Sequence, residues 1–211
     1  MRYVVVGAGG CSREVADLLV VLGHEPVAFY TEHPECDSIR GTPVINCIEM
    51  LPAHDAAVIA IGDSIVKKRL WKTFGTTTVL PTLIHPSAHV SPNTTIGDGC
   101  ILMENTTIKA DVTLGDGVLV NVGTVVGHDC QIGDFAHFAP GALIGGGCTI
   151  GEGAFCAIGS TLLPRIAVGA WATCAAGSVV TSDVDDHILV MGVPARAKRK
   201  TIADKKQEPY L

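Results

Sequence analysis

Hydrophobic residues recur at every sixth position from Ile84 to Val180, with no break in register. A small or β-branched residue stands two places before nearly every one of them, and a glycine follows many. A period of six fits neither an α-helix, with about 3.6 residues per turn, nor a hairpin meander, whereas short fixed repeats are typical of solenoids. We therefore predict a parallel β-helix: each six-residue unit forms a strand and a turn, and three units close a triangular coil around the hydrophobic residues. These residues are Ile84, Val90, Ile96, Leu102, Ile108, Leu114, Val120, Val126, Ile132, Phe138, Ile144, Ile150, Cys156, Leu162, Val168, Cys174 and Val180.

The chain before this repeat has a different pattern, in which short apolar runs alternate with segments of helical periodicity. A glycine-rich turn, Gly7-Ala8-Gly9-Gly10, follows the first run, and a turn-rich segment holds Gly41-Thr42-Pro43. Alternating strands and helices with short links predict a small, doubly wound parallel sheet. The expected strands are Tyr3–Val6, Val27–Tyr30, Ala57–Ile61 and Thr77–Leu80, and the expected helices are Ser12–Leu22 and about Ser64–Phe74.

The two patterns predict an α/β domain over residues 1–81, an all-β parallel β-helix over 82–181 and a C-terminal tail over 182–211. With 47% hydrophobic and 17% charged residues, the chain can bury a substantial core. Its net charge of −6 argues against a general nucleic-acid-binding protein. We expect a cytoplasmic protein, because no apolar run is long enough to span a membrane and the start of the chain does not resemble a signal peptide.

Most of the eight cysteines fit the interior of the repeat, where Cys behaves as a small hydrophobic residue. The others are Cys11, Cys36 and Cys47, and no CxxC pair occurs. We therefore expect neither a disulfide framework nor a metal site.

The glycine turn is a candidate phosphate or nucleotide site. It lies between a strand and a helix, where free backbone N–H groups can hold an anion. The candidate binding residues are Gly7, Gly9 and Gly10, with Glu32 after the second strand as a ribose or base contact. The turn lacks the full G-x-G-x-x-G spacing, so glycines that only allow the turn to pack are the alternative.

A second strand-to-helix turn contains Asp63, which is either a helix N-cap or a substrate contact. The basic residues Lys67, Lys68 and Arg69 follow on the helix. They form either a solvated face or a contact to a ligand phosphate.

Within the repeat, His128 and Asp129 are the strongest candidates for chemistry. His128 lies two places past an inward-facing residue, so it is expected on an outward turn beside a carboxylate that can orient the imidazole. His137 lies between inward-facing Ala136 and Phe138 and is also expected to point outward. A solvent-exposed turn histidine without a catalytic role is the alternative.

The chain resembles the family of sialic-acid and nucleotide-sugar acyltransferases with hexapeptide repeats. The resemblance covers essentially the whole chain. It rests on the GAGG turn and on the segments IAIGDS, LIHPSAHVSP, GHDCQIGDFAHFAPG and GVPAR. It implies a left-handed β-helix, a Rossmann-like domain that binds a nucleotide sugar, and a homotrimer with acetyl-CoA between neighbouring subunits.

The same resemblance implies direct acetyl transfer to the amino group of a nucleotide-linked 4-amino-4,6-dideoxy sugar. His128 would be the general base and Asp129 its acidic partner, while Asn121 would shape the acceptor site. The residues expected at the acetyl-CoA site are His137, Gly146, Ile158, Ala176 and Arg196.

The chain departs from the family pattern at three places. Asp129 stands where a glutamate is usual, Cys11 stands where the glycine turn often carries histidine, and Glu32 lies in the region where uridine-specific relatives have an aspartate. Uridine specificity is therefore not implied. The alternatives are O-acetylation of a sugar such as sialic acid, a non-catalytic trimer that binds sugar nucleotides, and a zinc enzyme like the trimeric carbonic anhydrases, for which a third histidine ligand is missing.

Overall fold

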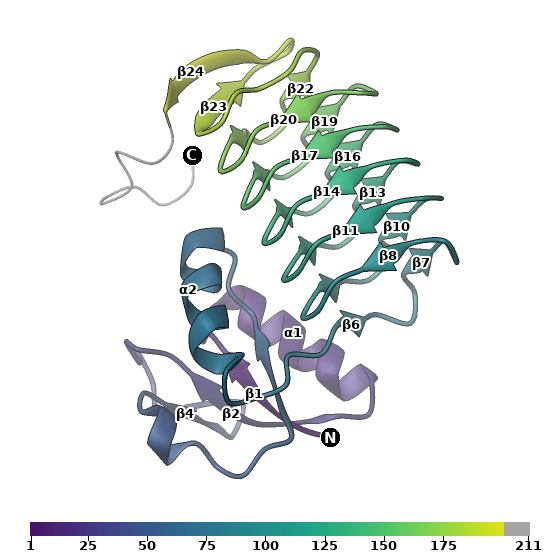
Figure 1. The fold of residues 1–211 in the computed structure, drawn as a ribbon. Helices are drawn as coiled ribbons and strands as arrows, with labels where there is room; N and C mark the ends of the chain where they lie inside the picture. Colours follow the sequence, from purple (N-terminus) through teal and green to yellow (C-terminus); the bar gives the residue numbers. More distant parts are fainter. Residues whose placement is uncertain (201–211) are drawn as a thin grey trace. The chain divides into compact units, whose positions relative to one another are not determined.

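The computed structural model describes residues 1–200, and the chain divides into two compact units. The first unit comprises Met1–His85 and the second begins at Pro86. Figure 1 shows an α/β unit and a stack of coils. Each unit is described by itself below. Within residues 1–200, no helix is long and apolar enough to cross a lipid bilayer.

The first unit is built on a five-stranded sheet with the order β3-β4-β2-β1-β5. Strands β1, β2, β4 and β5 are parallel, and β3 pairs antiparallel with β4. The elements are β1 Arg2–Val6, α1 Gly10–Val21, β2 Glu25–Tyr30, β3 Ser38–Ile39, β4 Thr42–Ile45, the 3₁₀ helix η1 Ile48–Met50, β5 Ala56–Ile59 and α2 Ser64–Phe74. The predicted alternation of strands and helices is confirmed.

Burial explains why the central strands are continuously apolar. Val4, Val5 and Val6 of β1 are fully buried, as expected for a parallel strand that is covered on both faces. Helix α1 buries Val15, Ala16, Leu18 and Leu19, which recur at helical spacing. Helix α2 begins at Ser64 and ends at Phe74, as the sequence predicts.

One prediction about this sheet is wrong, and one strand was not predicted. The strand expected at Thr77–Leu80 is reduced to a single bridge between Val79 and Ala56, because the backbone N–H groups of Thr77 and Thr78 bond back to the Phe74 carbonyl at the end of α2. Threonine hydroxyl groups support this turn: Thr77 Oγ1 donates to the same carbonyl. In addition, β4 forms within the segment predicted to be rich in turns, because Gly41 (φ +84°) closes a hairpin with β3.

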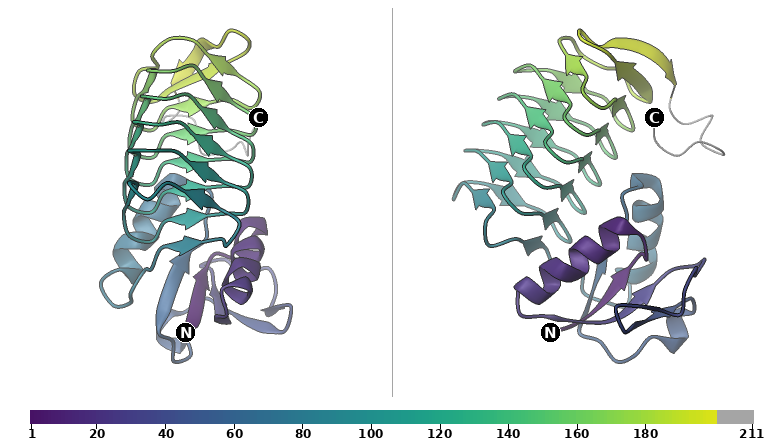
Figure 2. Two further views of the ribbon diagram at one scale, coloured as in Figure 1. Left: turned by 90° about the vertical axis from the view of Figure 1, so that its right-hand side faces the viewer. Right: turned by 180° about the vertical axis from the view of Figure 1, so that it is seen from behind.

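The second unit is a parallel β-helix of two-residue strands joined by turns (Figure 2), which confirms the predicted fold. Residues eighteen positions apart pair along the stack, for example Thr107 with Val125 and Val125 with Leu143. The strands are β7 His89–Val90, β8 Thr95–Ile96, β9 Ile101–Leu102, β10 Thr107–Ile108, β11 Thr113–Leu114, β12 Leu119–Val120, β13 Val125–Val126, β14 Gln131–Ile132, β15 His137–Phe138, β16 Leu143–Ile144, β17 Thr149–Ile150, β18 Phe155–Cys156, β19 Thr161–Leu162, β20 Ala167–Val168, β21 Thr173–Cys174 and β22 Val179–Val180. The short strand β6, Leu83–Ile84, precedes them.

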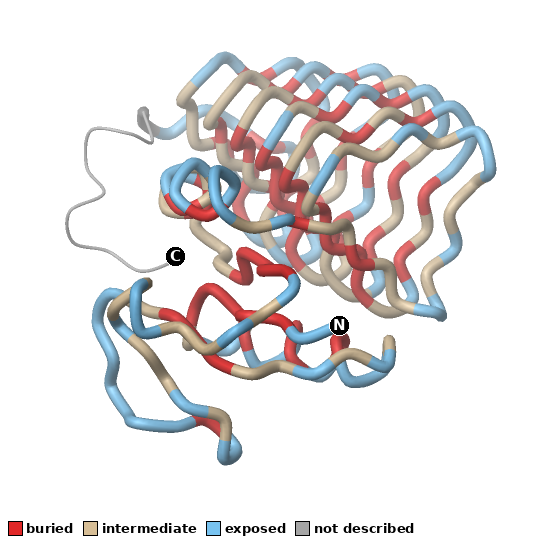
Figure 3. Tube along the Cα trace, turned by 60° about the horizontal axis from the view of Figure 1, so that its bottom comes forward, coloured by how far each residue is buried: buried red, intermediate tan, exposed pale blue. Residues whose placement is uncertain are grey.

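These strands form the three faces of a prism. One face contains β7, β10, β13, β16, β19 and β22, and the second contains β8, β11, β14, β17 and β20. The third runs from β9 through β12, β15, β18 and β21 to β23. In the two-residue strands the second residue points inward, and from Ile108 to Val180 these residues are at most 4% exposed. Figure 3 shows the buried positions repeating from coil to coil. Each such aliphatic side chain contributes about 1.5–3 kcal/mol when buried.

Carboxylates reinforce one corner of the prism. Asp116 Oδ1 accepts a hydrogen bond of 2.9 Å from the Asp98 backbone N–H, and Asp134 Oδ1 accepts one of 2.9 Å from Asp116. These aspartates lie eighteen residues apart, so each one satisfies the turn of the preceding coil. The aspartate side chains thereby accept hydrogen bonds from backbone N–H groups in the turns, where the strand-to-strand hydrogen bonding is interrupted.

The β-helix ends in two longer strands, β23 (Ile188–Met191) and β24 (Arg196–Lys200). Strand β23 pairs in parallel with β21, and β24 pairs antiparallel with β23. The first part of the predicted C-terminal tail thus continues one face of the prism. Residues 201–211 of that tail lie outside the described residues.

Candidate active site

His128 and Asp129 occupy the turn between β13 and β14, on one corner of the prism. The distance from His128 Nδ1 to Asp129 Oδ2 is 2.6 Å, and the two side chains are 69% and 64% exposed. When Nδ1 carries the proton, it donates a hydrogen bond to the carboxylate, and Nε2 keeps a lone pair. The pair therefore presents an oriented base to a reactant. Asp129 reaches the ring directly, although its side chain is one methylene shorter than that of a glutamate.

The backbone makes this short reach possible. Asp129 has φ +58°, in the left-handed region where Asp and Asn are tolerated better than most residues. Its N–H donates to the Ala110 carbonyl one coil before, at 3.0 Å. The His128 carbonyl accepts from the Gly147 N–H one coil after, at 2.7 Å. The turn that carries the pair is thus bonded to both neighbouring coils.

Gly146 lies one coil beyond His128 and provides the space for its ring. A Cβ atom at residue 146 would lie 2.6 Å from His128 Nε2 and 2.7 Å from Cε1. Such distances are closer than side-chain atoms pack, so only glycine accommodates the imidazole in this position. The structure therefore brings Gly146, predicted at the acetyl-CoA site, together with His128.

His137 does not have the exposure that the sequence suggests. It alternates with inward-facing Phe138 and so lies on the outer side of β15, but it is only 7% exposed. Its neighbours in register are Leu119 and Phe155, and the His137 and Phe155 rings lie 4.9 Å apart between centroids. These neighbours lie in the adjacent coils, and the repeat pattern does not specify them.

Other predicted residues lie on a different corner. Asn121 is in the turn between β12 and β13, Ile158 in the turn between β18 and β19, and Ala176 in the turn between β21 and β22. Asn121 Oδ1 accepts from the Val122 N–H at 2.7 Å, and Ile158 is 61% exposed. Within one chain, these residues and His128 belong to separate edges of the prism.

The glycine turn of the first unit contains two kinds of glycine. Gly7 (φ +122°) is packed: a Cβ atom there would collide with the Ser12 hydroxyl and lie 2.8 Å from the Ala60 carbonyl oxygen. Ser12 Oγ donates to that same oxygen at 2.9 Å. Gly9 and Gly10 are exposed, and a Cβ atom on Gly9 would meet nothing within 4 Å. Packing thus explains Gly7, whereas Gly9 and Gly10 leave the start of α1 open.

Asp63 is the N-cap of α2. Its Oδ1 accepts from the Ile65 N–H at 2.8 Å and from the Val66 N–H at 3.1 Å. The carboxylate thereby stabilises the start of the helix, which is the structural role weighed against substrate binding.

Glu32 follows β2 and forms a two-point ion pair with Arg69 of α2. Arg69 Nη1 donates to Oε1 at 2.6 Å and Nη2 donates to Oε2 at 2.5 Å. This hydrogen bonding holds the pKa of the Glu32 carboxyl below its usual value. Sequence reasoning selected Glu32 but missed the partner, because the two residues lie 37 positions apart.

Lys67 is not part of a solvated face. It is only 2% exposed and lies on the buried side of α2 with Ser64, Leu70 and Phe74. Its spacing from Leu70 and Phe74 could have revealed this. Burial raises the pKa of the Cys11 thiol, and the positive charge of Lys67 opposes that shift.

Arg196 begins β24, where its Nη1 donates to the Ala195 carbonyl at 2.8 Å.

Among residues 1–200, no group of three His, Cys, Asp or Glu side chains gathers in an arrangement that could hold a metal ion. None of the eight cysteines, all of which lie within residues 1–200, forms a disulfide, and Cys100, Cys130, Cys148, Cys156 and Cys174 are buried inside the prism as predicted.

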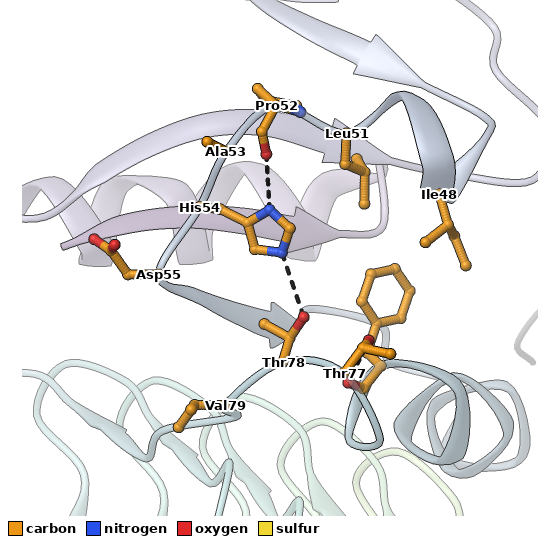
Figure 4. A pocket seen from close by; sticks show the side chains of 10 residues that line it. Ile48, Leu51, Pro52, Ala53, His54, Asp55, Thr77, Thr78 and Val79 are labelled. Atoms are coloured by element: carbon orange, nitrogen blue, oxygen red, sulfur yellow. Dashed lines mark hydrogen bonds between the residues drawn. The ribbon is translucent and has the colours of Figure 1, made fainter.

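A pocket of about 500 Å³ lies next to the start of β5 in the first unit (Figure 4). His54 stands in its wall, with Nδ1 2.8 Å from the Pro52 carbonyl oxygen and Nε2 3.3 Å from Thr78 Oγ1. These residues precede β5, whereas the glycine turn follows β1, and the two strands are parallel. The pocket is therefore separate from the glycine turn.

Comparisons with known proteins match both units. The model of the PglD N-terminal domain matches residues 2–74, and the model of the bacterial transferase hexapeptide, with six repeats, matches residues 111–146. No curated protein matches the chain.

Solved structures match nearly the whole chain. A mutant of perosamine N-acetyltransferase from Caulobacter crescentus, in complex with CoA and GDP-perosamine, is 32% identical, with a TM-score of 0.90, over 95% of this chain and 98% of that one. The acetyltransferase domain of PglB from Neisseria gonorrhoeae FA1090, in complex with acetyl coenzyme A, is 33% identical, with a TM-score of 0.86, over 93% and 98%. WeeI from Acinetobacter baumannii AYE is 27% identical, with a TM-score of 0.87, over 94% and 100%.

Matches to the PglD N-terminal domain, to the bacterial transferase hexapeptide and to solved acetyltransferases over nearly the whole chain identify a hexapeptide acetyltransferase. The chain belongs to the PglD-like N-acetyltransferase family.

Proposed function

We propose that this protein transfers the acetyl group of acetyl-CoA to the amino group of a nucleotide-linked 4-amino-4,6-dideoxy sugar, with His128 as the general base. The observation that carries the proposal is the 2.6 Å contact between His128 Nδ1 and Asp129 Oδ2, which leaves Nε2 available as an acceptor. The relatives in complex with acetyl coenzyme A or with CoA and GDP-perosamine support the choice of substrates.

The reaction is a direct transfer. The acceptor nitrogen attacks the thioester carbon while His128 Nε2 removes a proton from that nitrogen. The tetrahedral intermediate then collapses, the C–S bond breaks, and the protonated imidazole returns its proton to the sulfur of CoA. Asp129 holds the ring in one orientation and stabilises its positive charge. No acyl-enzyme forms, so no nucleophilic side chain is required.

The nucleotide part of the acceptor binds in the first unit, at the open glycines of the β1–α1 turn. Gly9 and Gly10 are exposed and lack side chains, so a phosphate can approach the N–H groups at the start of α1. Gly7, Glu32 and Asp63 complete the edge of the sheet, and Asn121 shapes the site for the sugar.

Acetyl-CoA binds between two prisms of a homotrimer. The separation of the predicted residues supports this arrangement, because Gly146 lies on the His128 corner while Ile158 and Ala176 lie on another. A groove between two subunits is lined by one corner of each prism. His137 lies beside the pantetheine arm and Arg196 beside the phosphates. Static light scattering tests the assembly: the mass is expected near three times 21.9 kDa, and a monomer contradicts it.

Release of CoA can be followed with a thiol reagent while a panel of nucleotide-linked amino sugars is supplied as acceptors. We expect turnover with at least one of them and a loss of about 100-fold or more in kcat for His128→Asn. His89→Asn is a matched control, because His89 is exposed on β7 and outside the proposed site. Unchanged turnover in His128→Asn contradicts the mechanism. Turnover with sialic acid but with no amino sugar establishes O-acetylation instead. An absence of turnover with every acceptor indicates a non-catalytic protein that binds sugar nucleotides.

A further inference from the structure

The positive charges of the coils lie on the corner of the prism that carries His128. Between Pro86 and Ala195 the chain has ten acidic residues but only two Lys or Arg residues, Lys109 and Arg165. Lys109 lies in the turn between β10 and β11, His128 in the turn between β13 and β14, and Arg165 in the turn between β19 and β20 (Figure 1). Each of these turns joins the first face of the prism to the second. An anionic ligand is therefore attracted to this corner and repelled from most of the remaining surface of the coils.

Arg165 lies two coils beyond His128, on the same side as Gly146. The Gly147 N–H donates to the His128 carbonyl at 2.7 Å, and the Arg165 N–H donates to the Gly146 carbonyl at 2.9 Å. These hydrogen bonds hold three successive turns in register. A Cβ atom at residue 147 would lie 3.4 Å from Arg165 Cγ. Gly146 and Gly147 thus form a surface without side chains between the imidazole and the arginine side chain.

The backbone at Arg165 is unfavourable for an arginine. Its φ is +64°, in the left-handed region, where Gly, Asn and Asp are tolerated better than other residues. The equivalent positions one and two coils before are Gly147, with φ +71°, and Asp129, with φ +58°. A glycine would be less strained at residue 165, so the folding of the turn does not account for the arginine. Strain of this kind points to a function for the side chain.

The guanidinium of Arg165 is available to a ligand. Arg165 is exposed, and within residues 1–200 no carboxylate forms an ion pair with it. By contrast, Arg40 is paired with Asp17 and Arg69 with Glu32. A planar guanidinium donates two parallel hydrogen bonds to the oxygens of a phosphate group. The side chain of Arg165 therefore has both the charge and the donors that a phosphate requires.

We propose that Arg165 binds the 5′-diphosphate of acetyl-CoA and thereby holds the coenzyme with its thioester beside His128. This inference rests on the proposed function. Two coils rise about 10 Å along the prism, a distance that the extended pantetheine arm between the thioester and the diphosphate can span. Lys109 lies one coil to the other side of His128, away from Gly146, so Arg165 is the coil cation on the acetyl-CoA side. The diphosphate adjoins the pantetheine arm, whereas the 3′-phosphate lies beyond it on the ribose.

A contact to the diphosphate is remote from the reacting atoms, so it stabilises the bound substrate and the transition state equally. Loss of this contact raises the KM for acetyl-CoA and leaves kcat nearly unchanged. Arg165 is therefore a coenzyme-binding residue, and its substitution has a different kinetic signature from that of His128.

Isothermal titration of the full-length protein with CoA, 3′-dephospho-CoA, pantetheine and GDP tests this assignment. In Arg165→Gly we expect the dissociation constant for CoA to rise about tenfold or more, the size of a hydrogen bond to a charged group. The constant for 3′-dephospho-CoA should rise by the same factor, because this compound retains the diphosphate. Pantetheine, which has no phosphate, and GDP should bind as they do to the wild type. The melting temperature should stay near that of the wild type or rise, because glycine relieves the left-handed backbone.

Arg40→Gly is the matched control. Arg40 is also an exposed arginine in the left-handed region, at φ +51°, but it lies in the turn between β3 and β4 of the first unit. The same chemical change at this residue should leave the dissociation constant for CoA unchanged. Arg165→Lys should recover part of the affinity, because lysine keeps the charge but not the planar fork. If Arg165→Gly fails to fold, Arg165→Asn takes its place, since asparagine also tolerates the left-handed region.

An uncharged variant of Arg165 that binds CoA within about twofold of the wild type overturns the inference. A loss of affinity for CoA that is absent with 3′-dephospho-CoA also overturns it, because the 3′-phosphate is then the partner. Weaker binding of GDP with unchanged binding of CoA assigns Arg165 to the acceptor and overturns it as well.

Release of CoA with nucleotide-linked amino sugars, measured in parallel, separates this result from the proposed function. Turnover together with a CoA affinity that does not depend on Arg165 rejects the inference alone. An absence of turnover with every acceptor rejects the proposed function, whereas the titration with CoA still measures the contact to the diphosphate.

Discussion

The ring of His128 lies against Gly146, the residue that occupies the same corner one coil later. A Cβ atom on Gly146 would be 2.6 Å from Nε2, the nitrogen proposed to remove the proton. The eighteen-residue coil thus couples a glycine to the orientation of the histidine.

We predict that Gly146→Ala displaces the imidazole and lowers kcat about tenfold or more, because misplacing a catalytic group by about 1 Å is costly. Steady-state kinetics measures the loss, and circular dichroism checks the fold. The control is Gly23→Ala, which also adds a methyl group to a glycine, at φ +75° with open space around it. Wild-type kcat in Gly146→Ala would show that the ring position is not required.

Asp129 is predicted to act through orientation and charge. Asp129→Asn keeps a residue that tolerates φ +58° but replaces the carboxylate with a neutral amide. We expect kcat to fall about tenfold to 1,000-fold, with little change in the melting temperature. Asp129→Glu should retain part of the activity but lose stability, since glutamate fits the left-handed region less well. An Asp129→Asn enzyme with full activity contradicts this role.

The aspartate ladder on another corner is predicted to be structural. Asp134→Ala leaves the Asp116 N–H without its 2.9 Å acceptor and should lower the free energy of unfolding by about 1 kcal/mol. Asp134→Asn keeps an acceptor oxygen and removes the repulsion between neighbouring carboxylates, so its stability should stay near that of the wild type. Chemical denaturation measures both variants, and equal losses would contradict the hydrogen-bonding role.

The two kinds of glycine in the β1–α1 turn should respond differently to substitution. Gly7→Ala collides with Ser12 and Ala60 and should destabilise the first unit. Gly9→Ala meets nothing in the protein, so it should leave the melting temperature nearly unchanged while weakening nucleotide binding. Melting curves with and without GDP separate the two effects. Equal GDP affinity in the wild type and Gly9→Ala would show that the phosphates do not approach this glycine.

The Glu32–Arg69 pair predicts a pH dependence with a definite sign. The pKa of Glu32 is lowered in the folded protein by its hydrogen bonds to Arg69. The pair therefore stabilises the fold above the unfolded pKa, and this stabilisation is lost as the pH falls through the folded pKa. Because the pair is exposed, solvent and salt screen it and the effect should be small. Denaturation of the wild type and Glu32→Gln at neutral and acidic pH should show a difference only at neutral pH.

The repeat period by itself determined the β-helix. A triangular coil has one interior position in six, so an uninterrupted series of hydrophobic residues leaves few other folds available. The bounds of α2 also followed from local signals, because Asp63 caps its start and Gly75 follows its last residue. His128 and Asp129 are adjacent in sequence, so their pairing was predictable too.

Only the tertiary structure decided which distant residues meet. His128 and Gly146 meet because coils stack every eighteen residues, and Arg69 reaches Glu32 because α2 passes the end of β2. The burial of His137 was likewise not read from the sequence, since it depends on neighbours such as Leu119 and Phe155 in the adjacent coils. Periodicity specifies which way a side chain points, whereas its partners and exposure depend on how segments far apart in the chain pack together.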